Sequence, residues 1–233
     1  MGYSYPRAQI KWTGIDFSMT SHYEIRLINT AQLSSLTRIH LLAFPKSAMT
    51  QLGTEVVYRY YDWLVNGPHP EAVRIGLFAN EDMLGFCFGG RFRGATGGFV
   101  RDNRYFLMWR VVTHPWLILN PFFRDRVKVG FSILRRLRKP KPAKGVSGQV
   151  LAIPSFGILA IATHPTYQGQ GVGHQLMDAA EGEARQKGFR QMHLTVHPDN
   201  HQAVRFYERL GWQRRDTEGV WQGVMEKHLS SSE

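Results

Sequence analysis

The sequence predicts an α/β fold, and three observations support this prediction. Its 233 residues are 43% apolar and 20% charged, which is typical of a globular chain that is long enough to bury a core. The alternating stretch Ala72–Ala79 turns at residues 80–82 and returns over residues 83–89, which indicates a β-hairpin. A long apolar stretch, residues 150–163, leads into a glycine-rich loop and an amphipathic helix. We therefore expect one domain of mixed strands and helices, or at most two small ones.

Ahead of the hairpin, the pattern predicts one strand and two helices. Residues 24–28 form the short strand. Residues 30–44 predict a helix that Thr30 caps and Pro45 ends, because apolar positions recur at helical spacing. Residues 47–65, which are rich in aromatic side chains, predict the second helix. The stripe of the first helix consists of Leu33, Leu36, His40 and Phe44.

After the glycine-rich loop, helices and strands alternate. Residues 191–197 predict a strand, Asn200 caps a second helix that Gly211 closes, and two strands follow near residues 212–215 and 220–226. The apolar face of the first helix consists of Val172, Leu176, Met177, Ala180 and Ala184. Inward positions on the strand are Met192, Leu194 and Val196, and those on the second helix are Ala203, Tyr207 and Leu210.

The net charge of +11 is concentrated in one segment. Residues 124–144 carry nine Lys or Arg and one acidic residue, which leaves +3 for the rest of the chain. Nucleic-acid-binding proteins usually spread such charge over a face of the fold, so we expect no nucleic-acid partner. We interpret residues 91–148 as a basic amphipathic insertion with short helices across residues 112–137. Residues 112–144 then predict an anionic membrane surface as a partner, with a polyanion or a simple solvated loop as alternatives.

Cysteine, histidine and targeting patterns limit the remaining classes. Cys87 is the only cysteine, so a disulfide scaffold is excluded. We expect its side chain to be small and buried. A lone cysteine also fits a reducing, cytoplasmic setting, which allows peripheral membrane contact. No stretch has the roughly 18 apolar residues of a membrane span. Residues 1–18 lack a signal-peptide core, so we expect a tail or extension before a domain at residues 19–233. The ten histidines show no zinc spacing, so we expect no metal.

The glycine-rich loop predicts an anion site. Backbone N–H groups at a helix N-terminus converge there and the helix dipole adds partial positive charge, so a phosphate or pyrophosphate is the expected ligand. A Walker A loop would need Lys after Gly173, where the chain has His174, and a dinucleotide fingerprint would need a glycine at that same position. The pattern Q/R-x-x-G-x-G/A is matched by Gln168, Gly171 and Gly173.

With a second motif, this loop resembles the GNAT superfamily of N-acetyltransferases, which use acetyl-CoA. The first motif runs from residues 162–165 into the loop. The second, residues 200–212, resembles the family's N-x-x-A-x-x-x-Y-x-x-x-G-[FW] segment. The resemblance covers residues 155–229. It implies an α/β acyl-CoA N-acyltransferase fold, a mixed and mostly antiparallel sheet that is splayed at its centre and has helices on both faces.

The resemblance also implies a reaction and a role for each matching residue. Acetyl would pass directly from acetyl-CoA, as co-substrate, to a primary amine in a ternary complex. Tyr207 would be the catalytic residue, donating a proton to the departing thiolate, since a phenol has a pKa of ~10 and a thiol ~8.5. Asn200 would contact the cofactor. The strand edge that pairs with the pantetheine arm would be Ile161, Ala162 and Thr163, and the amides that hold the pyrophosphate would be Gln168, Gly169, Gln170, Gly171, Val172 and Gly173.

One departure from the family concerns the general base. Many members carry a Glu on the strand before the loop, whereas this chain has no carboxylate between Leu151 and Thr163. An alkyl amine must lose a proton before it attacks. Besides a side-chain base, water could take this proton, or the acceptor could be an amine of lower pKa such as an amino sugar. No nucleophile–base pair is visible either, and Cys87, the only thiol, lies on the hairpin and away from the motif, so we expect no covalent enzyme intermediate. Candidate bases are Glu55, Glu81, Asp82, His164 and His197.

The missing carboxylate leaves an alternative function open. A non-catalytic acyl-CoA-binding or scaffold protein would keep the fold and act through its basic insertion at a membrane surface or polyanion. The intact glycine loop and Tyr207 argue against that alternative. For the enzyme, the acceptor is a small-molecule or peptide amine.

Overall fold

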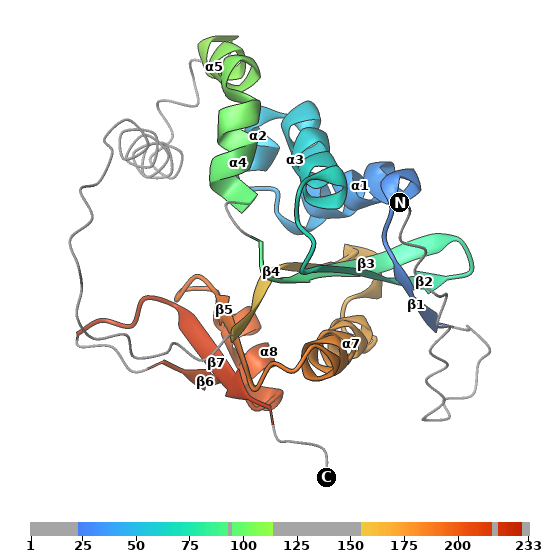
Figure 1. The fold of residues 1–233 in the computed structure, drawn as a ribbon, viewed down its shortest axis with the longest axis vertical. Coiled ribbons are helices and arrows are strands. Elements are labelled where there is room, and N and C mark those ends of the chain that lie inside the picture. The colour runs from blue at the N-terminus through green and yellow to red at the C-terminus, as the bar shows by residue number, and fades with distance from the viewer. Residues whose placement is uncertain (1–22, 93–94, 114–154, 216–218, 230–233) are drawn as a thin grey trace, which may run out of the picture.

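The structure, a computed structural model, describes residues 23–92, 95–113, 155–215 and 219–229. Within these residues a seven-stranded sheet has the order β1-β2-β3-β4-β5-β7-β6, and every neighbouring pair is antiparallel except β4 and β5 (Figure 1). This confirms the mixed, mostly antiparallel sheet. The strands are β1 (Tyr23–Leu27), β2 (Ala72–Ala79), β3 (Asp82–Gly90), β4 (Ser155–Thr163), β5 (Gln191–Thr195), β6 (Gln213–Arg214) and β7 (Val224–His228).

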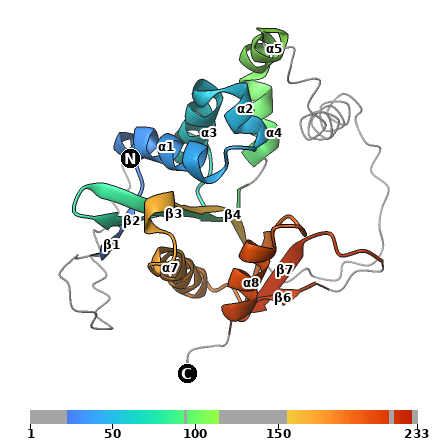
Figure 2. The same cartoon turned by 180° about the vertical axis from the view of Figure 1, so that it is seen from behind.

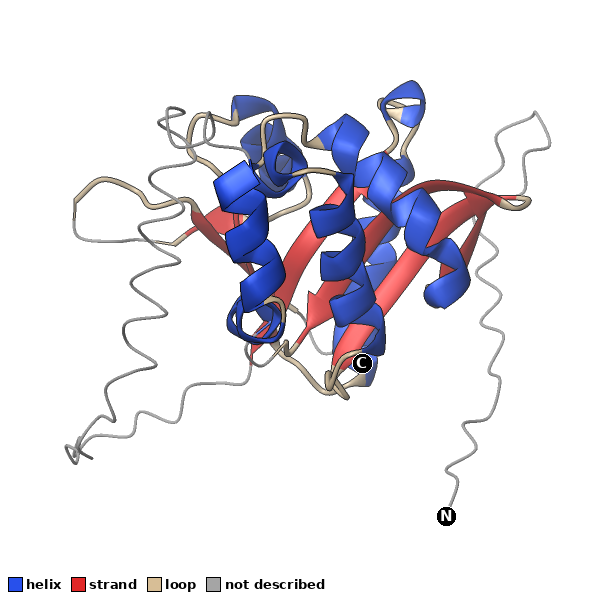
Figure 3. Cartoon of the chain, turned by 90° about the horizontal axis from the view of Figure 1, so that it is seen from above, coloured by secondary structure: helices blue, strands red, loops and turns tan. Residues whose placement is uncertain are grey.

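Helices cover both faces of the sheet, as the family resemblance implies (Figures 1 and 2). Figure 3 shows from above how several of them lie across the strands. The first side carries α1 (Leu33–Ala43), α2 (Ala48–Leu52), α3 (Thr54–Asn66), α4 (Ala95–Asp102) and α5 (Arg104–Thr113). The other side carries α7 (Val172–Gln186) and α8 (His201–Arg209). Two short 3₁₀ turns are η1 (Thr30–Gln32) and η3 (Pro165–Tyr167).

Each face of the sheet has its own hydrophobic core. One core joins α1 and α3 to outward residues of β2 and β3, such as Phe78 and Phe86. The other joins α7 and α8 to the opposite face of the same strands, through residues such as Ile75 and Leu84. The hairpin strands are therefore buried on both faces, which fixes their register because a one-residue slip would exchange the two cores. The predicted apolar face of α7 is confirmed, since all five of its members are buried.

Two helix predictions in the N-terminal part are wrong in detail. Asn29, not Thr30, caps the first helical segment, because its Oδ1 accepts the Ala31 N–H at 2.8 Å. The predicted helix over residues 47–65 is two helices, α2 and α3. Gly53 separates them with a φ of +108°, a conformation that a residue with a side chain rarely adopts.

Several predicted segments fall outside the described residues. They include the tail at residues 1–18, residues 150–154 of the long strand and the basic residues 124–144, and what the sequence indicates for them stays a prediction. Of the predicted insertion, α4 and α5 are described, and α5 ends at Thr113. Four apolar side chains on α5 are exposed: Tyr105, Met108, Trp109 and Val112. The last strand is shifted from the predicted residues 220–226 to Val224–His228.

The sheet opens between β4 and β5, which confirms the predicted splay. The two strands pair from Ser155 opposite Gln191 to Ile158 opposite Leu194, and among the described residues the rest of β4 has no strand partner on that side. A β-bulge on the β3 side leaves Leu159 outside the register, between Ile158 and Ala160. A bulge bends its strand and adds local twist. The bend at Leu159 therefore starts the opening.

Candidate active site

The glycine loop at the end of β4 has the geometry of an anion site. Gly169 and Gly171 have φ values of +77° and +81°, and a Cβ added to either would meet nothing within 4 Å. Glycine is therefore required at both positions by backbone conformation, while the space above them is open to a ligand. Gly171 is the N-cap of α7, whose first turn holds no acidic residue. The positive end of the helix dipole is thus uncompensated and faces open space.

Neighbouring residues hold this loop in place. The His164 N–H donates to Leu84 O at 2.8 Å, and His164 Nδ1 accepts the Thr166 N–H at 3.3 Å. The Gln170 side chain donates to Thr166 O at 3.0 Å. His164, one of the candidate bases, therefore caps the turn that leads into the loop. Gly173 lies close to α8, because a Cβ there would come within 3.3 Å of the Phe206 ring.

Tyr207 on α8 is buried, with 8% of its surface exposed, and its ring packs against Trp212 at 6.1 Å between centroids. Burial raises the pKa of Tyr207, and the Cys87 thiol beside it raises that pKa further. Cys87 is the register partner of Ile161 across β3 and β4. The structure therefore brings Tyr207 to the stretch of β4 that the resemblance assigns to the pantetheine arm.

Cys87 itself is buried, as expected, and burial raises the pKa of its thiol to about 12. It stays protonated at neutral pH and is a poor nucleophile. Its position corrects the sequence-based view that the hairpin lies away from the motif, because pairing of β3 with β4 places Cys87 next to it.

The predicted strand edge is open on one side. Ile161, Ala162 and Thr163 pair with Cys87, Phe86 and Gly85 of β3. On the side of β5, no strand in the described part of the chain pairs with their backbone groups, because that pairing ends at Ile158. A free strand edge can pair with an extended ligand arm. Whether the three residues do so stays a prediction.

Asn200 caps α8, since its Oδ1 accepts the Ala203 N–H at 3.2 Å. We expect Asn200→Ala to lower the free energy of unfolding by about 1 kcal/mol through loss of the cap. It should also weaken acetyl-CoA binding if Asn200 contacts the cofactor. Asn200→Ser keeps a capping oxygen on a shorter side chain, so urea unfolding and calorimetry together separate the two roles. Unchanged binding by the Ser variant would leave Asn200 as a cap alone.

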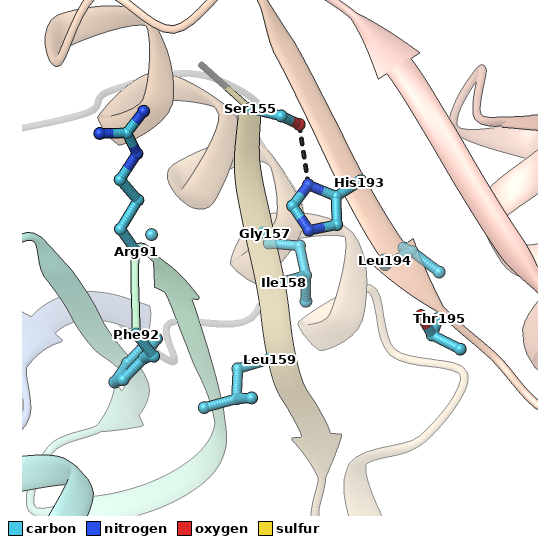
Figure 4. Close-up of a pocket in the computed structure, with 10 residues that line it drawn as sticks. Arg91, Phe92, Ser155, Gly157, Ile158, Leu159, His193, Leu194 and Thr195 are labelled. Atoms are coloured by element: carbon cyan, nitrogen blue, oxygen red, sulfur yellow. Dashed lines mark hydrogen bonds between the residues drawn. The ribbon is translucent and has the colours of Figure 1, made fainter. Parts of the chain in front are cut away.

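A cavity of about 650 Å³ opens where β4 and β5 separate (Figure 4). This volume is within the range of small-molecule sites. No residue that the sequence analysis assigned to the site lines it. The lining residues are Gly90, Arg91, Phe92, Ser155, Gly157, Ile158, Leu159, His193, Leu194 and Thr195.

Two polar side chains in this cavity form a contact that sequence reasoning missed. Ser155 Oγ and His193 Nδ1 are 2.8 Å apart, although 38 positions separate them in the chain (Figure 4). The parallel pairing of β4 and β5 brings them together, since Gly157 is the register partner of His193. The outward position of His193 in the alternating strand was the available signal. The sequence alone did not show this pair, and the expectation that no covalent enzyme intermediate forms stays a prediction.

The electrostatic surroundings of His193 favour its neutral form. The His193 side chain is exposed, and the partial burial of its ring is the largest effect, which lowers its pKa from the ordinary value. Glu226, its register partner on β7, raises the pKa, and Arg215 lowers it. Arg215 and Glu226 also pair with each other at 3.3 Å, which reduces the field of each. His193 is therefore unprotonated at neutral pH.

The five candidate bases named from the sequence lie elsewhere. Glu55 pairs with Arg59 on the surface of α3, and Glu81 and Asp82 lie at the exposed turn of the hairpin. His197 is exposed beside Asp199. None of the five lines the cavity. In the part of the chain that the structure describes, no group of three or more His, Cys, Asp or Glu could hold a metal ion, and no helix is long and apolar enough to cross a membrane.

The splayed sheet, the glycine loop and the cavity along β4 define the class of CoA-dependent acyltransferases. Residues 34–212 match the model of the acetyltransferase (GNAT) family, which is more than half of the chain. The chain therefore belongs to this family.

Relatives span a range of acceptors. The chain is 26% identical over 112 residues to a Bacillus subtilis (strain 168) protein provisionally named ribosomal protein bS18-alanine N-acetyltransferase, covering 48% of this chain and 74% of that protein. It is 38% identical over 68 residues to mycothiol acetyltransferase of Nocardiopsis dassonvillei, covering 29% of this chain and 21% of that protein. The structure of PaiA N-acetyltransferase from Thermoplasma acidophilum with coenzyme A aligns at a TM-score of 0.53 and 15% identity, over 89% of this chain and 99% of that one. At such identity the structural likeness shows the fold alone.

Proposed function

We propose that this chain is an N-acetyltransferase that passes acetyl from acetyl-CoA directly to a primary amine in the cavity between β4 and β5. The observation that supports it most is the arrangement along β4. The glycine loop follows the C-terminal end of the strand, and the cavity lies along its N-terminal half. The unpaired strand edge at residues 159–163 connects them.

The residues present fit acetyl-CoA as a substrate. The amides of residues 168–173 at the start of α7 would hold the pyrophosphate, because Gly169 and Gly171 leave that space open. The pantetheine arm would pair with the free edge at Ile161, Ala162 and Thr163. The thioester would then lie near the bulge at Leu159, where the cavity begins.

In the reaction, the amine nitrogen attacks the thioester carbonyl carbon and the C–S bond breaks. A backbone N–H on the free edge of β4 would stabilise the oxyanion, a type of contact worth about 10²–10³-fold in rate. Tyr207 stays protonated at neutral pH, because its pKa is raised. It would donate a hydrogen bond to the departing thiolate and so stabilise it. A thiol has a pKa of ~8.5, well below the raised pKa of Tyr207, so complete proton transfer from the phenol to the thiolate is unfavourable. The hydrogen bond therefore contributes more than proton transfer would.

We expect Tyr207→Phe to lower kcat by about 10²-fold, because only the hydroxyl that would face the leaving sulfur is removed. The dissociation constant of acetyl-CoA should stay within a factor of two or so of wild type, since a contact made in the transition state leaves ground-state binding unchanged. Steady-state CoA release and calorimetry check both values. Tyr105→Phe on the surface of α5 is the matched control. A Tyr207→Phe enzyme with wild-type kcat would remove the proposed role.

The charge of the residues that line the cavity favours some classes of acceptor amine over others. Among the described residues that line the cavity, Arg91 carries a permanent positive charge and none carries a carboxylate. A polycationic amine would gain nothing from such a site. A peptide N-terminus, as in the alanine acceptor named for the Bacillus relative, or a neutral amino sugar fits it better.

The buried Cys87 thiol suits a reducing compartment, so we propose a cytoplasmic setting.

The test is calorimetric titration of acetyl-CoA into the full chain, followed by CoA release with three amines. The amines are an alanine-initiated peptide, glucosamine and ethylamine. Binding with turnover of any of the three supports the proposal. Binding without turnover favours the acyl-CoA-binding scaffold, and absence of binding removes the cofactor premise.

A further inference from the structure

We propose that His193 on β5 is the general base for the acceptor amine and that Ser155 positions it. This inference rests on the proposed acetyltransferase function. It answers the absence of a carboxylate on β4, because the neighbouring strand supplies the base. His193 and Ser155 both line the cavity, and neither belongs to the two motifs of the family resemblance (Figure 4).

A glycine on β4 makes room for the imidazole. A Cβ added to Gly157 would lie 3.0 Å from His193 Nε2 and 3.1 Å from Cε1. That is tighter than ordinary contact, so any larger residue at position 157 would displace the ring. The space beside Gly157 can therefore hold either a side chain from β4 or the imidazole from β5, but not both. This chain has glycine on β4 and histidine on β5.

Ser155 fixes the orientation of the ring. Its Oγ lies 2.8 Å from His193 Nδ1, and the second ring nitrogen lies on the side away from Ser155 (Figure 4). When Ser155 accepts the Nδ1 proton, the lone pair of Nε2 is available as a base. Ser155 is thus a positioning residue rather than a nucleophile.

Nε2 lies on the side where the thioester would be. Gly157 and Leu159 are two residues apart on β4, which corresponds to about 7 Å along a strand. The bulge and the end of β4–β5 pairing are at Leu159. An amine bound beside Nε2, between Gly157 and Leu159, can therefore reach both Nε2 and a carbonyl carbon at the bulge. Ser155, two residues further from the opening, is too remote to attack that carbon itself.

Three charged residues lie on the elements next to His193. Glu226 faces it from β7, Arg215 follows β6, and Arg91 lines the cavity at the end of β3. Arg91 is 3.6 Å from Glu71, and Arg215 is 3.3 Å from Glu226, so each cation has a carboxylate partner. Burial remains the largest effect, and it lowers the pKa of His193. The imidazole is then free to accept a proton at neutral pH.

The step starts from the neutral amine, whose ammonium proton has passed to water. The amine lone pair forms the N–C bond, one N–H proton passes to His193 Nε2, and the C–S electron pair leaves with sulfur. The thiolate, hydrogen-bonded by Tyr207, takes a proton from water when CoA is released. His193 returns its proton to water. The products are the acetamide and CoA.

The first experiment compares His193→Asn with His228→Asn in acetylation of the three amines named above. Asn places a hydrogen-bonding group where Nδ1 was and can keep the bond to Ser155, but it has no Nε2. We expect kcat/KM for the amine to fall by about 10²-fold, with acetyl-CoA binding unchanged. His228 is an exposed histidine at the end of β7 and should give wild-type rates.

The pH profile adds a readout that a structural role would not change. Protonation inactivates a base, so wild-type kcat/KM should fall as the pH drops through the His193 pKa, which lies below the ordinary value of 6.5. His193→Asn should lack that acid limb, while ionisation of the amine itself is common to both proteins. Equal rates and equal profiles for the two proteins would overturn the role of His193. No turnover by the wild type would instead overturn the proposed function, and this inference with it.

An NMR measurement on the full chain with labelled histidine is independent of any acceptor. We expect neutral His193 to carry its proton on Nδ1 and to titrate below 6.5, and Ser155→Ala to reduce the preference for that tautomer. In the neutral ring, a proton on Nε2 would overturn the assignment, because Nε2 would then have no lone pair to accept the amine proton.

Discussion

Gly171→Glu is expected to weaken acetyl-CoA binding by about 10²-fold, which corresponds to ~2.7 kcal/mol. Gly171 is the N-cap of α7, and its Cα faces open space. A glutamate there would extend into the proposed pyrophosphate site and place like charges side by side, which costs several kcal/mol. Calorimetric titration of acetyl-CoA into both proteins measures the difference.

The same helix provides the matched control. Gly188, just beyond the end of α7, also has a positive φ, +76°, and a Cβ there would also meet nothing within 4 Å. Gly188→Glu therefore carries a similar backbone strain and the same added charge, but at the helix end remote from the loop. It should lose stability like Gly171→Glu and bind acetyl-CoA like wild type. Equal binding by the two variants would contradict a pyrophosphate site at residues 168–173.

Leu176→Ala is expected to lower the free energy of unfolding by about 2–5 kcal/mol. Leu176 is fully buried on α7 and faces β3, since its Cδ1 lies 3.0 Å from where a Cβ on Gly85 would be. The substitution removes apolar contacts and leaves a cavity under the helix that carries the glycine loop. Urea unfolding followed by circular dichroism measures the loss.

Leu42→Ala is the control for this variant, because it makes the same change in another helix. Leu42 is 46% exposed on α1, and its truncation should change stability by no more than about 0.5 kcal/mol. Comparable losses in the two variants would show that α7 is not packed on the sheet as described.

Local patterns predicted most of the fold because they reflect local physics. The helices α7 and α8 each show a single period that matches one buried face, and the hairpin shows a clear turn between two apolar strands. The structure has all three where the pattern places them. The break at Gly53 was missed because one glycine inside an apolar stretch does not show its φ. The break also depends on a distant residue, because Arg110, 58 positions away, donates two hydrogen bonds of 2.9 and 2.7 Å to Leu52 O.

The glycine loop and Tyr207 could be named from the sequence because each lies within a continuous motif. The motif encodes a backbone shape at a helix end, which needs no information from distant residues. Cys87 was misplaced for the opposite reason, since its neighbour Ile161 is brought to it by pairing of β3 with β4.

By itself, the sequence determined the class of protein, an α/β acetyltransferase fold, and the position of the glycine loop at the start of α7. Only the tertiary structure decided where the cavity proposed for the acceptor lies and that Ser155 meets His193 in it. The physical reason is that the cavity exists because two parallel strands part at a bulge. Register between strands depends on how the whole sheet packs, and no local period of the chain carries that information.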